Sequence, residues 1–223
     1  MRMLILSTVC TMLCVAGAGV EADEYRVEAI DTSSPADDLA PAVAERLSAT
    51  GFKVLTDKGR ALCEVWPAAS WQVAADFEAN GAVNYPLEVG ELVGVIRFAR
   101  SGGDFRGQKI RKGTYTMRYG LQPQDGNHVG TSDTRDFVVL VPAADDSDPK
   151  PLAKEDLFKE STNASGTAHP AILSLLPPDN NAKTLPRIVH HDERNLWAVD
   201  FAGKSSEGKP VQAELVVVGQ SGE

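Results

Sequence analysis

Hydrophobic and polar residues alternate along much of the chain. In residues 114–121 an apolar side chain stands at every second position from Tyr115 onward, and residues 211–218 repeat the pattern. Successive side chains of a strand point to opposite faces of a sheet, so a period of two predicts half-buried β-strands. The same pattern predicts strands at 25–30, 52–56, 61–66, 71–75, 91–99 and 195–201.

Residues 137–141 are apolar at every position, which indicates a central strand covered on both faces. Residues 187–191 are a weaker strand candidate. Turn signals such as Lys112-Gly113 and Asp125-Gly126 separate the runs. Nine or ten short strands with glycine-rich turns are typical of an antiparallel β-sandwich, of the jelly-roll or immunoglobulin-like type, rather than of an alternating α/β fold.

Helices are expected to be few. Pro41 suits a helix start and Gly51 suits the position just past its end. A second short helix is predicted at 151–162, and a third at 170–176, ended by the prolines that follow. Residues 142–151 are acidic and unpatterned, which favours a solvated loop. This loop would lead into a small helical insertion at about 150–177.

The N-terminus has a different pattern. Arg2 is followed by a run of small and apolar residues that reaches Val20, and Ala22 stands directly before Asp23. A positive start, an apolar run and small or branched residues before the cut are the layout of a secretory signal peptide. We therefore predict a cleaved signal peptide at 1–22.

Two other interpretations of this segment stay open. A retained membrane helix needs ~20 apolar residues, and hydroxyl and glycine residues interrupt the run. A lipid anchor on Cys10 or Cys14 requires a small residue before the cysteine, where the chain has Val9 and Leu13. No second long apolar stretch follows, so we expect residues 23–223 to form one domain, secreted or periplasmic, with no transmembrane anchor after cleavage.

Cysteine content and charge narrow the class of protein. Of three cysteines only Cys63 would remain after cleavage, so the domain would have no internal disulfide and would depend on core burial. Cys63 lies among apolar residues, which predicts a buried, unreactive thiol. The net charge is −9 and is spread along the chain. An acidic surface repels nucleic acid, and no basic stripe or RNA-binding motif is present, so we expect no nucleic-acid partner.

The four histidines all lie in the second half of the chain. Imidazole and carboxylate groups are ligands for zinc or iron, and the nearby carboxylates are Asp125, Asp133, Asp192 and Glu193. One alternative is therefore a divalent-metal site of His128, His169, His190 and Asp133. Adjacent residues of a strand face opposite ways, so His190 and His191 cannot both bind one ion. No HxH, HExxH or CxxC spacing is present, and surface histidines are the simpler interpretation.

Patterns for nucleophilic or phosphate chemistry are missing. No GxSxG segment occurs. Ser165 and His169 are near each other only in sequence, which favours helix-end hydrogen bonding. The glycine-rich residues 102–107 lack a GK[ST] ending. We therefore assign no catalytic residue, and the sequence favours a non-catalytic protein while leaving an enzyme open.

Tryptophans are a second kind of candidate, because their rings can stack on sugars. Trp197 alternates with apolar residues and is expected to point inward. Trp71 follows Pro67 and a run of small residues, and we expect it to be exposed. The candidate ligand-binding residues are thus Trp71, His128 and His169.

Several stretches together resemble a known group of proteins. They are Ile96-Arg97-Phe98, Gly103-Asp104-Phe105-Arg106, the run IRKGTYTMRYGLQP at 110–123, DGNH at 125–128, TRDF at 134–137 and SGTAHPA at 165–171. With the flanking strands they resemble uncharacterised secreted proteins of bacteria, planctomycetes among them. The strand KGTYT alone is also similar to one in a bacterial β-rich domain of unknown function. The resemblance implies bacterial export and one compact unit, and it brings no activity.

The sequence thus favours an exported β-sandwich that binds an envelope protein, a glycan or a small molecule and needs no cofactor. The first alternative is a metal-binding protein or metal-dependent hydrolase that uses the His/Asp cluster. The second is a purely structural component of the envelope. Whether the four imidazoles converge in the fold is the observation that separates these hypotheses.

Overall fold

The structure is a computed structural model that describes residues 24–32, 34–126, 128 and 130–221. The predicted signal peptide, residues 1–22, lies outside the described residues. Within the described ranges, the helices are all too short or too polar to cross a lipid bilayer.

The described chain is mainly β and antiparallel, as predicted. Ten strands form one sheet in the order β1-β2-β3-β4-β7-β8-β9-β12-β11-β10, and β5 pairs with β6 in a small hairpin. The strands of the large sheet are β1 Tyr25–Ile30, β2 Gly51–Thr56, β3 Ala61–Pro67, β4 Leu92–Phe98, β7 Gly113–Leu121, β8 Asp136–Pro142, β9 Ala171–Leu176, β10 Arg187–His191, β11 Leu196–Lys204 and β12 Pro210–Val218. The hairpin strands are β5 Gly102–Gly103 and β6 Lys109–Ile110. The helices are α1 Pro41–Ala44 and α2 Lys154–Ser165. Single 3₁₀ turns lie at Ala36–Asp38, Ala143–Asp145 and Asp192–Arg194.

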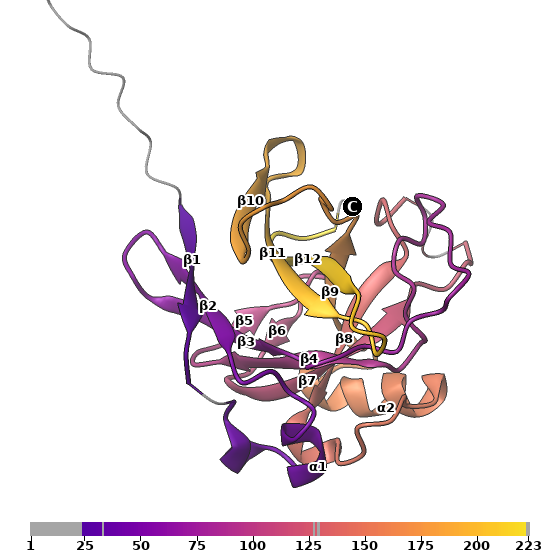
Figure 1. Cartoon of the computed structure of the whole chain (residues 1–223), viewed down its shortest axis with the longest axis horizontal. Helices are drawn as coiled ribbons and strands as arrows, with labels where there is room; N and C mark the ends of the chain where they lie inside the picture. Colours follow the sequence, from indigo (N-terminus) through magenta and orange to yellow (C-terminus); the bar gives the residue numbers. More distant parts are fainter. Residues whose placement is uncertain (1–23, 33, 127, 129, 222–223) are drawn as a thin grey trace, which may run out of the picture.

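The large sheet is nearly closed on itself. It curls so that β10, β11 and β12 stand over β1, β2 and β3 (Figure 1). The two outermost strands, β1 and β10, are in contact. Beside this seam the rings of Tyr25 on β1 and Trp197 on β11 meet edge to face with centroids 5.2 Å apart. The main hydrophobic core fills the space that the curled sheet encloses.

Alternation along each strand decides which residues enter this core. Tyr115, Met117 and Tyr119 of β7 belong to the enclosed cluster, together with Val138 and Leu140 of β8. The other face of β8 is covered by α2, where Val139 and Val141 pack on Leu157. This confirms 137–141 as a central strand covered on both faces. Cys63 is buried, as predicted, and burial raises the pKa of its thiol to about 12.

The third predicted helix, 170–176, is wrong, and so is the extent of the insertion at 150–177. Residues 171–176 are β9, which pairs with β8 on one side and β12 on the other. A short apolar run has the same signature in a buried strand as in a buried helix. Only α2, residues 154–165, is a helical addition, and it packs on the outer face of β8.

Two smaller predictions also differ from the structure. The first helix covers only Pro41–Ala44, and Gly51 begins β2 rather than following a helix end. A Cβ on Gly51 would lie 2.4 Å from the carbonyl oxygen of Val65 and 2.8 Å from the Trp66 indole, so glycine is there for close packing. Residues 71–75 form isolated bridges, Trp71 to Ser205 and Val73 to Leu87, instead of a strand.

The acidic stretch at 142–151 is not simply a solvated loop. Asp146 within it is buried, and its carboxylate pairs with the guanidinium of Arg118 from β7. The loop is thereby tied to the outer face of the sheet next to α2.

Candidate functional site

His128 and His169 line the same pocket on the outer face of the sheet. We call it the histidine pocket. It has a volume of about 220 Å³ and lies where β7, β8, β9 and α2 meet. Its walls are apolar and its rim holds Arg106, Gln122 and the two histidines. The wall residues are Gly120, Leu121, Pro123, Phe137, Val139, Phe158, Pro170 and Ile172.

The walls of the histidine pocket include apolar side chains that are only partly buried. Leu121, Phe158 and Ile172 are half-buried, whereas Phe137 and Val139 are fully buried behind them. Gly120 supplies no side chain to this surface, and a Cβ there would lie 2.7 Å from a methyl carbon of Val139. The pocket therefore depends on glycine at position 120. Apolar surface kept open beside a few polar groups is typical of a ligand site.

Arg106 reaches the rim from the β5–β6 hairpin, whose turn is organised by Asp104. The buried Asp104 carboxylate accepts hydrogen bonds from the backbone N–H groups of Arg106 (3.0 Å), Gln108 (2.7 Å) and Ile172 (3.2 Å) and from the Gln108 side chain (2.8 Å). Burial nevertheless raises the pKa of Asp104, because desolvation outweighs these bonds. Asp104 thus fixes the hairpin against the start of β9. Within the described part of the chain, the Arg106 guanidinium has no hydrogen-bond or ion-pair partner.

The two histidines come from different loops. His128 lies between β7 and β8, and its Nδ1 is 2.6 Å from a carboxylate oxygen of Asp125. His169 follows α2, where the Ser165 hydroxyl donates to the His169 carbonyl oxygen at 2.6 Å. The His169 backbone N–H donates in turn to Thr167 at 3.0 Å. Ser165 is therefore engaged with backbone at the helix end, as the sequence indicated, and not with the imidazole.

The remaining residues of the proposed metal set lie elsewhere. His190 stacks on Trp197, with ring centroids 4.0 Å apart, and its Nδ1 is 2.8 Å from Asp192. Asp133 forms an ion pair with Arg194. Among the described residues, no group of three or more histidine, cysteine, aspartate or glutamate side chains is placed to hold a metal ion. The four imidazoles do not converge; only His128 and His169 share a pocket.

The expected exposure of Trp71 is wrong. Its side chain is fully buried, and its indole N–H donates to the Val93 carbonyl oxygen at 2.9 Å. The indole occupies space left by Gly203, where a Cβ would lie 2.4 Å from the ring. Trp66 and Trp197 are buried as well, at 1% and 7% exposed. No tryptophan of the described chain therefore offers an open face to a sugar.

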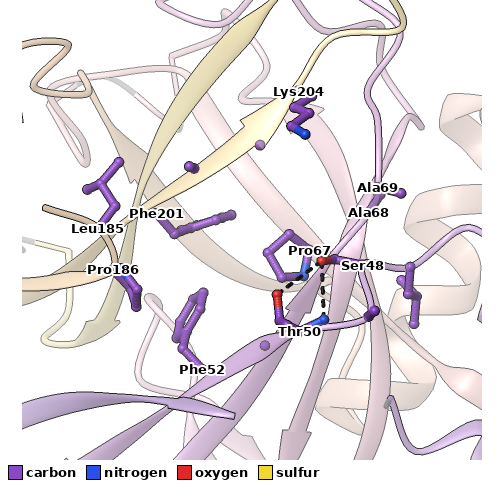
Figure 2. A pocket seen from close by; sticks show the side chains of 15 residues that line it. Ser48, Thr50, Phe52, Pro67, Ala68, Ala69, Leu185, Pro186, Phe201 and Lys204 are labelled. Atoms are coloured by element: carbon purple, nitrogen blue, oxygen red, sulfur yellow. Dashed lines mark hydrogen bonds between the residues drawn. The ribbon is translucent and has the colours of Figure 1, made fainter. Parts of the chain in front are cut away.

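A second pocket, of about 430 Å³, opens between β2–β3 and the end of β11. Figure 2 shows Phe52 and Phe201 entering it from opposite strands, with Leu185 and Pro186 on one side and the hydrogen-bonded Ser48 and Thr50 on the other. The two phenylalanines are only 3% and 2% exposed, because most of their surface packs in the core. This second pocket is thus a shallow depression whose rim includes Ser48, Thr50 and Lys204.

A third opening, of about 500 Å³, lies at the opposite end of the curled sheet beside Tyr25 and Leu62. The charged residues that line it are Asp104 and Arg194, and both already bind other residues of the chain. Of these three pockets, the histidine pocket has the most apolar walls, and its rim carries Arg106, whose guanidinium has no partner among the described residues.

Sequence reasoning found two of the residues at the histidine pocket and missed the others. Arg106 belongs to the glycine-rich segment 102–107, which carries no binding motif. Ile172 lies in the segment expected to be a helix, and Phe158 was expected only as a helix anchor. No sequence motif marks Asp104 or Arg106, so no local signal singled them out.

Comparison of the chain with protein-family models, with curated proteins and with solved structures finds no match. The functional argument therefore depends on the geometry above.

Proposed function

We propose that this chain is a non-catalytic binding module that holds a small, largely apolar molecule in the histidine pocket. The observation that carries the proposal is the meeting of His128, His169 and Arg106, from three separate loops, around one apolar pocket. Polar groups on a fixed scaffold, arranged around apolar walls, orient a ligand and give specificity. Gly120 leaves the space of the pocket open, and the buried Asp104 carboxylate holds the Arg106 loop beside it.

The volume limits the ligand to a small body. Drug-sized ligands occupy pockets of roughly 300–1,000 Å³, whereas a cavity of about 150 Å³ already holds benzene. At about 220 Å³ the histidine pocket suits one six-membered ring or a short branched chain. Sugars are a poorer fit, because the described tryptophans are all buried.

A binding role is also supported by how the polar groups are used. Ser165 binds backbone at the end of α2, and Asp125 binds His128. Neither arrangement pairs a nucleophile with a base, which acyl transfer needs. We therefore expect the ligand to be released chemically unchanged.

The setting of this module is part of the proposal. The apolar N-terminal run favours export and a place in the bacterial envelope, as a secreted or periplasmic domain of residues 23–223. We take the curled sheet to work as a β-sandwich whose two layers hold the loops of the pocket rigidly. Cell fractionation and N-terminal sequencing of the mature protein test the location: a cut after Ala22 supports export, and an intact cytosolic chain contradicts it.

The binding proposal is tested by filling the pocket. Toluene is titrated into the ¹⁵N-labelled protein, and amide shifts are followed by NMR. We expect shifts around Leu121, Phe158 and Ile172 that saturate, and their loss in Ile172→Trp, whose larger ring occupies the pocket. Recovery of unchanged toluene checks that no reaction occurs.

The matched control is Ile188→Trp, at a half-buried isoleucine of β10 outside the pocket. It should keep the shifts of the wild-type protein. Should Ile172→Trp fail to fold, Phe158→Ala on α2 removes a wall instead and should weaken binding. The proposal is wrong if toluene produces no saturable shifts, or if Ile172→Trp binds as well as Ile188→Trp.

A further inference from the structure

We infer that the ligand of the histidine pocket is a small carboxylate: one aromatic ring or short branched chain that carries an anionic group held by Arg106. This inference rests on the proposed function and adds the charge and chemical class of the ligand.

The first observation is the charge of the lining. The chain as a whole is acidic, with 31 acidic residues against 22 lysines and arginines. None of the residues that line the histidine pocket is an aspartate or glutamate, and Arg106 is a full positive charge among them. A cationic lining on an acidic protein attracts an anionic ligand and opposes a cationic one.

The second observation is that the Arg106 guanidinium has no hydrogen-bond or ion-pair partner among the described residues and can therefore bind a ligand. The neighbouring polar side chains already have partners within the fold: Asp104 accepts four hydrogen bonds, and His128 lies 2.6 Å from Asp125. Among the described residues the guanidinium forms no hydrogen bond or ion pair with either of them. The planar guanidinium matches a carboxylate in a two-bond geometry, which a lysine cannot offer.

The third observation is how the arginine is positioned. Asp104 holds the Arg106 backbone N–H and the backbone N–H of Ile172, and Ile172 is itself a wall of the pocket. One buried carboxylate therefore fixes the cationic rim and the apolar wall relative to each other. A ligand that uses both features at once needs its charge and its apolar body within one small molecule.

Hydrogen-bonding groups complete the rim. His128, His169 and Gln122 can bind the second carboxylate oxygen or a substituent of the ring. Asp125 is not part of the lining and lies behind His128, so Arg106 is the nearer charge to a ligand in the pocket. On α2 the Lys154 ammonium lies 5.7 Å from the Phe158 ring, which adds positive charge beside the wall.

The test compares three probes by calorimetric titration: phenylacetate, its neutral isostere phenylacetamide, and acetate. We expect phenylacetate to bind at least tenfold more tightly than phenylacetamide, and acetate to bind no better than phenylacetamide because it lacks the ring. Added salt should weaken phenylacetate more than phenylacetamide, because screening acts on charge.

Arg106→Gln should reduce phenylacetate binding at least tenfold and leave phenylacetamide unchanged. Arg100→Gln, at an exposed arginine outside the pocket, is the matched control and should change neither. Both positions are exposed, so the variants are expected to fold, which circular dichroism checks.

The outcomes separate this inference from the proposed function. Equal binding of phenylacetate and phenylacetamide, lost from both in Ile172→Trp, would overturn the carboxylate assignment and leave the apolar binding site standing. Binding of phenylacetate that survives Ile172→Trp would place the anion elsewhere and overturn it too. Failure of all three probes contradicts the inference, while toluene binding then decides the proposed function separately.

Discussion

Arg118 and Asp146 form an ion pair from which water is excluded entirely. Both side chains are 0% exposed, and two parallel bonds of 2.8 Å join Nε and Nη2 of the arginine to the two carboxylate oxygens. The remaining guanidinium hydrogens go to carbonyl oxygens, Gly90 at 2.9 Å and Lys150 at 2.7 Å among them. Such a pair offsets its own desolvation only when every donor and acceptor is satisfied.

We therefore predict that Asp146→Leu destabilises the protein by about 3–5 kcal/mol, the cost of leaving one buried charge without its partner. Urea unfolding measures the change. The double variant Arg118→Met with Asp146→Leu should be more stable than Asp146→Leu alone, because the uncompensated charge is gone. Glu28→Gln, in an exposed ion pair with Lys53, is the control and should change the stability far less, because solvent screens that pair. An equal effect of Asp146→Leu and Glu28→Gln would contradict the argument.

A second prediction concerns pH. Burial raises the pKa of four carboxyl groups: Glu91, Asp104, Asp136 and Glu214. A carboxyl group with a raised pKa holds its proton to higher pH in the folded chain than in the unfolded one. Its contribution to stability is complete below the ordinary pKa and is lost as pH rises through the folded value.

The free energy of unfolding should therefore fall as pH rises above the ordinary carboxyl pKa values of 3.8 and 4.5, through these groups. Glu214→Gln should make the fall shallower. Position 214 faces Asp200 of β11, which adds to the raised pKa, and His191 of β10, which opposes it. Urea unfolding at several pH values measures the slope. A slope of the opposite sign, unchanged in Glu214→Gln, would show that these carboxyls do not govern it.

A third prediction concerns Cys63. The thiol is 1% exposed and its pKa is raised to about 12 by burial. A thiol reagent should leave it unmodified in the folded domain and modify it rapidly in denaturant. The folded state keeps the proton where the unfolded thiol, with an ordinary pKa near 9, has lost it. Stability should thus decline as pH rises above about 9, and Cys63→Ala should remove that part of the decline. Fast modification under native conditions would refute the burial.

A fourth prediction concerns the hydrogen bonds by which Asp104 fixes the β5–β6 hairpin to the start of β9. Asp104→Ala leaves four hydrogen-bond donors without their acceptor, in a site that is 2% exposed. We expect a loss of stability of about 2 kcal/mol or more. Hydrogen exchange should speed up at the amides of Gln108 and Ile172, while β2 and β3 remain protected. Uniform acceleration over the whole sheet would instead indicate a general loss of the fold.

The strands were predictable where one face is buried and the other is not. β1 and β10 have the predicted bounds, and β7 and β12 differ by one residue at the start. β9 was not predictable as a strand, because it lies between β8 and β12 and its residues are apolar almost throughout. A period of two is visible only when one face meets water.

The site was less predictable, because its parts are fixed by contacts between distant segments. Trp71 is buried since Gly203 leaves room for its indole, and nothing near Trp71 in the sequence indicates this. Asp146 is buried since Arg118 lies opposite it. Arg106 reaches its pocket through the bonds of Asp104 to β9. Residue types suggested candidates such as His128, and only the tertiary contacts select among them.

The seam between β1 and β10 has a consequence for how copies of the chain behave at high concentration. An outer strand with open amide and carbonyl groups is a template for pairing with a neighbouring molecule, which leads to aggregation. Here the two outer strands of the sheet lie against each other, and Tyr25 of β1 also contacts the ring of Trp197 on β11. Each outer strand therefore occupies part of the edge of the other, and we expect the curved sheet to pair with other molecules less readily than a flat sheet with two open edges.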